Sequence, residues 1–245
     1  MCLEFFDGIE DNIAFSYTIN ENQELVPIKK CHYHLFNSNI YPFVIYEEEL
    51  GSLNQYCYEI TQIVKSRFHQ AVREVAEYKN TDGRLTANKN FTNYEMLLGS
   101  QHNMYLWQEI AWHSACHLTV LLYSFLERAL KKLYYDLFKE TTATLHLPKG
   151  TAKIYIYLAH IFQLHIHEWR QQEPNIYHLL ELARKVRNGF VHGNFQKNSM
   201  NQEYEEIKKF PPFHLIELID TISSVLDRVE RQYEMNSHHS NRINR

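Results

Sequence analysis

The chain has 245 residues, of which 44% are hydrophobic and 14% aromatic, so it can fill a substantial core. A formal net charge of −4 excludes a generally basic nucleic-acid coat, and any such contact must come from a local patch. The chain lacks an uncharged apolar run near the ~20 residues of a membrane span, and its first residues lack a secretory pattern. With four cysteines in no paired spacing, we expect a cytoplasmic protein without a membrane partner.

Residues 1–46 predict a small β or irregular extension. Apolar residues alternate over 13–19, residues 20–24 read as a turn, and 31–36 and 43–46 favour strands. We therefore treat this segment as a cap that precedes the main domain.

The rest of the chain is typical of helices. Apolar residues recur at three- and four-residue spacing in five stretches: 47–79, 103–139, 152–170, 174–193 and 213–233. The connection 81–101, with a short helix near 94–98, is the expected internal seam. We predict an all-α, antiparallel bundle of about five helices over 47–236, followed by a disordered tail at 237–245.

The stretch 174–193 carries the most unusual residues. Its apolar stripe consists of Ile176, Leu179, Leu180, Ala183, Val186 and Phe190. Arg187 falls on the flank of this stripe, where its guanidinium must reach solvent or find an anion. Asn188 and His192 are i, i+4 neighbours, although Gly189 weakens the turn between them.

The run Arg187-Asn188-Gly189-Phe190-Val191-His192 resembles the motif of the HEPN superfamily, in its stricter Arg-Asn-x-x-x-His form. Arg231 and His238 satisfy only the looser spacing and lack the Asn. The resemblance implies a metal-independent endoribonuclease of a toxin, anti-phage or RNA-processing system, without a cofactor. It also implies a homodimer with the motif helices at its interface, and products with 2′,3′-cyclic phosphate and 5′-hydroxyl ends.

These residue types suit metal-free cleavage of RNA. His192, with an ordinary pKa of about 6.5, can take the 2′-hydroxyl proton or protonate the leaving oxygen. Arg187 can hydrogen-bond two oxygens of the scissile phosphate, and Asn188 could fix the imidazole tautomer or orient the phosphate. One chain has one such His, so a twofold dimer is expected to supply the second.

Other residues extend the predicted site. Glu127 is similar to an acidic position on an earlier core helix of several HEPN groups, and it could pair with Arg187 or be a solvated carboxylate. Arg184, Lys185 and Lys197 could contact phosphates or be an ordinary solvated face. Some HEPN toxins carry a Tyr two residues after the His that a partner enzyme modifies. Asn194 stands there, so an antitoxin or defence partner would act otherwise.

Two alternatives remain. One is a non-catalytic HEPN module that binds RNA or a nucleotide, or serves as a dimerisation scaffold in a defence complex. Burial of Arg187 away from solvent would favour it. The other is a metal enzyme built on His113, Cys116 and His117, which share one helix face but have no evident fourth ligand. We expect no metal there, and we expect the helical pattern to splay His165 and His167.

Overall fold

The computed structural model describes residues 17–19, 25–27, 38–80, 93–138, 152–191 and 214–243, and nearly all of them are helical. The helices are α2 (Phe43–Asn80), α3 (Asn93–Phe138), α4 (Lys153–Phe162), α5 (Ile166–Gln172), α6 (Pro174–Val191) and α8 (His214–Ile243). The predicted all-α bundle is confirmed.

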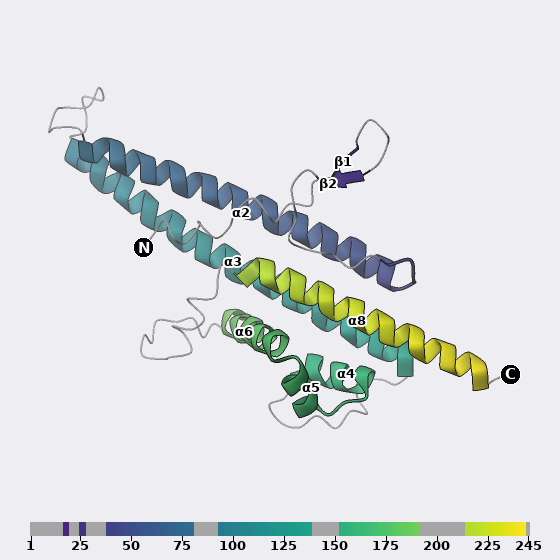
Figure 1. Cartoon of the computed structure of the whole chain (residues 1–245). Coiled ribbons are helices and arrows are strands. Elements are labelled where there is room, and N and C mark those ends of the chain that lie inside the picture. Colours follow the sequence, from purple (N-terminus) through teal and green to yellow (C-terminus); the bar gives the residue numbers. More distant parts are fainter. Residues whose placement is uncertain are drawn as a thin grey trace.

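The long helices α2 and α3 form an antiparallel hairpin that supports the rest of the molecule (Figure 1). Helix α8 contacts both of them, α4 and α6 contact α3, and the short α5 joins α4 to α6. Helix α6 runs antiparallel to α3, so its C-terminal end points toward the projecting end of the hairpin (Figure 1). This arrangement places the candidate motif where the bundle gives way to the hairpin.

The main core lies between α2, α3, α4, α6 and α8. Its largest fully buried side chains are Tyr134, Tyr157, Phe43, Phe68, Leu50, Leu122 and Leu126, of which Phe68 belongs to a separate cluster in the hairpin. The apolar periodicity explains this burial, because residues three and four apart lie on one helix face, which is removed from water when the helices pack.

The N-terminal extension contains two short strands, β1 (Tyr17–Ile19) and β2 (Leu25–Pro27). They pair antiparallel, with Thr18 opposite Val26. The predicted strand at 31–36 lies outside the described residues. The predicted strand at 43–46 is wrong, since Phe43, Tyr46 and Leu50 are buried at helical spacing in the first turns of α2.

The helix boundaries differ from prediction in three places. Helix α3 begins at Asn93, ten residues before the expected start, so Gly99 and much of the predicted seam are helical. Helix α8 continues to Ile243, through most of the expected disordered tail. The predicted helix 152–170 is two helices, separated at Gln163.

A local backbone conformation causes that separation. Gln163 adopts the left-handed region with φ 56°, and the Leu164 amide donates to the Ala159 carbonyl at 2.9 Å, which satisfies the end of α4. The His165 amide then donates to the Glu168 carboxylate at 2.8 Å, at the start of α5. A Gln in place of the usual Gly at such a stop explains why the sequence pattern does not reveal it.

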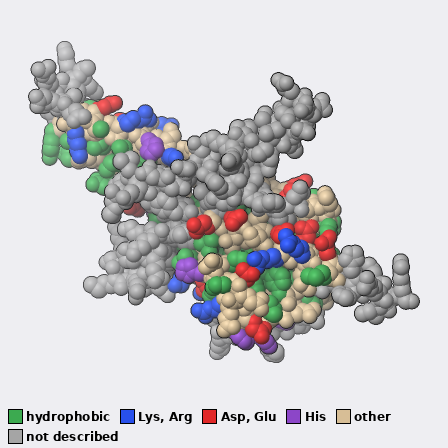
Figure 2. Space-filling view, viewed as in Figure 1, with side chains coloured by type: hydrophobic (Ala, Val, Ile, Leu, Met, Phe, Trp, Pro, Cys, Tyr) green, Lys and Arg blue, Asp and Glu red, His purple; other side chains and the backbone are tan. Residues whose placement is uncertain are grey.

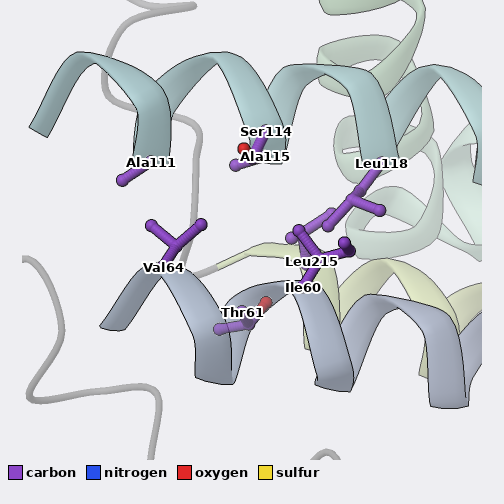
Figure 3. A pocket seen from close by; sticks show the side chains of 8 residues that line it. All are labelled: Ile60, Thr61, Val64, Ala111, Ser114, Ala115, Leu118 and Leu215. Carbon is purple, nitrogen blue, oxygen red and sulfur yellow. The ribbon is translucent and has the colours of Figure 1, made fainter. Parts of the chain in front are cut away.

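Beyond the bundle, the described part of the chain continues as the α2–α3 hairpin (Figure 1). A small hollow marks the junction between α2, α3 and the first turn of α8 (Figure 3). It is lined by Ile60, Thr61, Val64, Ala111, Ser114, Ala115, Leu118 and Leu215. Further out, a second core cluster holds the hairpin together around Val64, Phe68 and Ala111. Across the described residues, each helix is too polar or too short to span a membrane.

Candidate functional site

Helix α6 presents the candidate residues on the edge of a buried face. Leu179, Leu180, Ala183 and Val186 are buried against the core, as the stripe predicts. Phe190 is an exception, because 37% of it is exposed at the end of the helix. The stripe therefore ends one turn before the motif does, and the last turn of α6 reaches solvent.

Arg187 lies at this edge, between the bundle and solvent. Its Nη2 atom is 3.8 Å from Glu127 Oε2 on α3, and its side chain is 34% exposed. Its Nη1 atom donates a hydrogen bond to Asn188 Oδ1 at 3.0 Å. The predicted contact between Glu127 and Arg187 is thus present. Asn188 also binds the guanidinium, a contact that the sequence does not predict.

Arg184, one turn earlier, is engaged differently. Its Nε and Nη2 atoms donate three hydrogen bonds to the Glu181 carboxylate, at 2.8 to 3.1 Å. These bonds and the charge of Glu181 raise the pKa of Arg184, against the opposing effect of its partial burial. This bidentate pair counts against the predicted phosphate contact of Arg184, because its donors already have a carboxylate partner. Lys185 is half-buried on the same helix, and its predicted role stays a prediction.

Two buried tyrosines, Tyr123 and Tyr155, interact with these charges. Burial raises the pKa of Tyr123 and of Tyr155, and the Glu181 carboxylate raises both further. Glu127 adds to the effect at Tyr123, whereas Arg184 and Arg187 act against it. Both phenols stay neutral near pH 7, so neither adds to the charge that Glu127, Glu181, Arg184 and Arg187 bring to the site.

His117 reaches the end of α6 from α3. Its ring stacks on the Phe190 ring, with 5.9 Å between centroids and 9° between planes. Sequence reasoning considered His117 only as a metal ligand and missed this contact, because no local pattern links positions 73 residues apart. His192 and Lys197 lie outside the described residues, so their predicted places in the site are untested.

The alternative metal site lacks the required geometry. Cys116 is fully buried, while His113 and His117 are exposed and pack on Trp112 and Phe190. Within the described ranges, no three His, Cys, Asp or Glu side chains gather to hold a metal ion.

One histidine prediction is wrong. His165 and His167 do not splay: their rings stack at 5.6 Å between centroids and 15° between planes. The reason is that His165 precedes α5 in an extended conformation instead of continuing the preceding helix. The two histidines therefore meet across a helix start.

The hollow of Figure 3 is a separate feature from the Arg187 region. Its walls are apolar apart from the hydroxyls of Thr61 and Ser114, and none of the lining residues is charged. It therefore lacks the cations that recognition of a phosphate needs. The residues around Arg187 remain the stronger candidate.

Comparisons with protein-family models, with curated proteins and with solved structures find no match to this chain.

Proposed function

We propose that the protein is a metal-independent endoribonuclease of the HEPN type, acting on single-stranded or loop RNA as a toxin or anti-phage effector. The observation that carries the proposal is the state of Arg187. Its side chain is 34% exposed, its contact with Glu127 is 3.8 Å, and Asn188 orients it. A scaffold helix would instead bury this arginine or tie it closely to an acid.

The contrast with Arg184 explains why this state favours binding of an anion. Arg184 gives three hydrogen bonds to one carboxylate, whereas the contact between Arg187 and Glu127 is too long for a hydrogen bond. Arg187 therefore keeps donors for a phosphate, while the Glu127 charge helps to hold the guanidinium in place. A planar guanidinium can bridge two phosphate oxygens as negative charge develops on them.

His192 would move the proton. As a base it takes the 2′-hydroxyl proton while the oxygen attacks the adjacent phosphorus, and as an acid it protonates the departing 5′-oxygen. The bond between phosphorus and the 5′-oxygen breaks, which leaves a 2′,3′-cyclic phosphate and a 5′-hydroxyl. Because one imidazole cannot serve both roles in a concerted step, the proposal includes a homodimer and, by the HEPN resemblance, a regulatory partner protein.

The test is cleavage of total RNA and tRNA by the purified full chain in EDTA, with the new ends mapped. We expect cyclic phosphate ends, a ~100- to 10,000-fold loss for His192→Ala and a ~100-fold or larger loss for Arg187→Ala. Arg187→Lys should also lose most activity, because a single ammonium does not reproduce the bidentate geometry.

The chain supplies a matched control. Arg231 and His238 have the looser motif spacing, and Arg231 pairs with Asp227 on the surface of α8 at 2.6 Å. Arg231→Ala and His238→Ala should cleave like wild type. Loss of activity in EDTA would point to a metal enzyme. Absence of any His192-dependent cleavage, even with proteins of its own locus added, would overturn the proposal in favour of a non-catalytic scaffold.

A further inference from the structure

The projecting part of α3 exposes an apolar face. Tyr94 is 68% exposed, Leu98 47% and Tyr105 59%. At 100° per residue these three side chains lie within a sector of about 40°, and we call them the α3 stripe. The same sector continues to Trp112 and Cys116, which the bundle buries. One helix face is therefore core in the bundle and surface in the hairpin.

The hairpin has little core of its own. Its buried cluster consists of Val64, Phe68 and Ala111, with partly buried neighbours. Two helices form only a single layer, and a stable helical domain normally packs such a layer against a second one. In the bundle α4, α6 and α8 provide that second layer (Figure 1). In the hairpin the α3 stripe has no corresponding cover among the described residues.

The two helices of the hairpin carry opposite charge. Residues 93–112 of α3 contain Glu95 and Glu109 but no Lys or Arg. Residues 60–79 of α2 contain four basic residues and two acidic ones: Lys65, Arg67, Arg73, Lys79, Glu74 and Glu77. Figure 2 shows hydrophobic side chains next to Lys and Arg side chains at the projecting end. The hairpin is thus negative along one helix and positive along the other.

The arginines of α2 also differ from those in the bundle. Arg67 contacts the Gln70 amide oxygen at 3.5 Å, and Arg73 contacts the His69 carbonyl at 3.4 Å. Both side chains are exposed, and their partners within the described ranges are neutral. Their charge is available to an acidic surface.

We propose that a second copy of this chain covers the α3 stripe, with α3 of each copy against α2 of the other. Such an arrangement makes an antiparallel four-helix bundle with twofold symmetry, in which each acidic helix meets a basic one. The 20 residues of α3 span about 30 Å, and with a width of about 20 Å each copy presents on the order of 600 Å². The total of about 1,200 Å² reaches the range of specific protein interfaces.

The chemistry of the stripe favours a protein partner over RNA. Exposed tyrosines can stack on bases, but nucleic-acid surfaces place cations beside them. Here Glu109 falls about 40° from Tyr105 on the same helix, and residues 93–112 supply no cation. A phosphate backbone along the stripe would meet carboxylates, whereas the α2 helix of a second copy brings arginines and lysines.

The first test is sedimentation velocity of the full chain and of the double variant Leu98→Lys/Tyr105→Lys, whose new cations would face the basic α2 of the partner copy. We expect a wild-type dimer and a dissociation constant at least ~100-fold higher for the variant, because each copy would place two charges in the interface. Circular dichroism must show that the variant keeps its helix content. Tyr135→Lys is the matched control, since Tyr135 is 49% exposed on the bundle part of α3 and should not affect dimerisation.

The second test locates the contact. A zero-length carbodiimide is applied to an equal mixture of ¹⁴N and ¹⁵N protein, and the cross-linked peptides are identified by mass spectrometry. Mixed-isotope products that join Glu95 or Glu109 to Lys65 or Lys79 are expected. This readout needs no substitution, so it stands even if the double variant fails to fold.

The inference rests on the proposed function only in that the proposed chemistry requires a dimer; its interface involves the hairpin, and its tests contain no RNA. A monomeric wild type, a folded double variant that stays dimeric, or mixed-isotope products confined to the bundle would overturn it. A dimer that cleaves no RNA would remove the proposed function and leave this interface intact. RNA cleavage by wild type together with a folded double variant that stays dimeric would do the reverse.

Discussion

The bundle and the projecting hairpin share helices α2 and α3, but their arginine side chains have different partners. Six arginines of the bundle meet a carboxylate or an aromatic ring: Arg128 with Glu49, Arg170 on Tyr177, Arg184 with Glu181, Arg187 with Glu127, Arg228 with Glu173, and Arg231 with Asp227. In the hairpin, the partners of Arg67 and Arg73 among the described residues are neutral. These six arginines of the bundle are therefore mostly paired with acids, whereas the two arginines of the hairpin are not.

Within the bundle, the contact of Arg187 with Glu127 differs from the other arginine contacts. Most of its arginine contacts are local or exposed and contribute little to stability. The contact of Arg187 with Glu127 is long and lies across helices, at the boundary between the two regions. Arg187 is therefore held in position but keeps hydrogen-bond donors free for a ligand, as a binding site requires.

The largest expected difference between the regions is in core energetics. Leu126 is fully buried in the bundle, so Leu126→Ala should lower the free energy of unfolding by about 2 to 5 kcal/mol. Leu98→Ala makes the same change on the same helix at 47% exposure, and should cost about 0.5 kcal/mol or less at high dilution. Urea unfolding at low protein concentration measures both. Equal losses would mean that the hairpin is as well packed as the bundle.

An intermediate effect is expected from Glu230, a buried acid of α8. Its carboxylate accepts a hydrogen bond from the Ser38 hydroxyl, and it is 8% exposed. Burial raises its pKa, the Ser38 bond lowers it in part, and the nearby Glu234, Asp227 and Glu47 raise it further. Since the folded pKa exceeds the unfolded one, this contribution to stability is full below the unfolded pKa and is lost as pH rises through the folded pKa.

Glu230→Gln removes that titration and keeps an acceptor for Ser38. We expect the variant to be more stable than wild type at pH 7, with the difference vanishing toward pH 4, as measured by thermal unfolding across pH. Glu74→Gln is the control from the hairpin surface, where Glu74 accepts a 3.2 Å bond from Gln70. An advantage of wild type that grows with pH would refute this account of Glu230.

The smallest expected effect concerns Gly99 in the hairpin. A Cβ atom added there meets nothing within 4 Å, so Gly99→Ala should stabilise α3 by up to about 1 kcal/mol. Gly51→Ala is equally unobstructed in the bundle part of α2. Hydrogen exchange distinguishes the two: Gly99→Ala should slow exchange mainly in the hairpin, and Gly51→Ala in the bundle. Uniform slowing by both would show that the hairpin and bundle open as one unit.

Much of the fold follows from local sequence pattern. Apolar residues at three- and four-residue spacing identify α2, α3, α6 and α8, because a single helix face must leave water wherever it packs. The contact between Glu127 and Arg187 was also foreseen, through the HEPN resemblance. The pattern does not distinguish a strand from a helix in short runs such as 43–46, because aromatic residues fit both equally well.

The remaining features are not visible in the apolar spacing. The stacking of His117 on Phe190 depends on the packing of α6 against α3, which brings together residues 73 positions apart. The left-handed Gln163 and the start of α3 at Asn93 also leave no mark in that spacing. The α3 face that includes Tyr94, Tyr105 and Trp112 gives the clearest example. Its spacing marks it as apolar along its whole length, but only the position of the other helices decides which part is core and which part is surface.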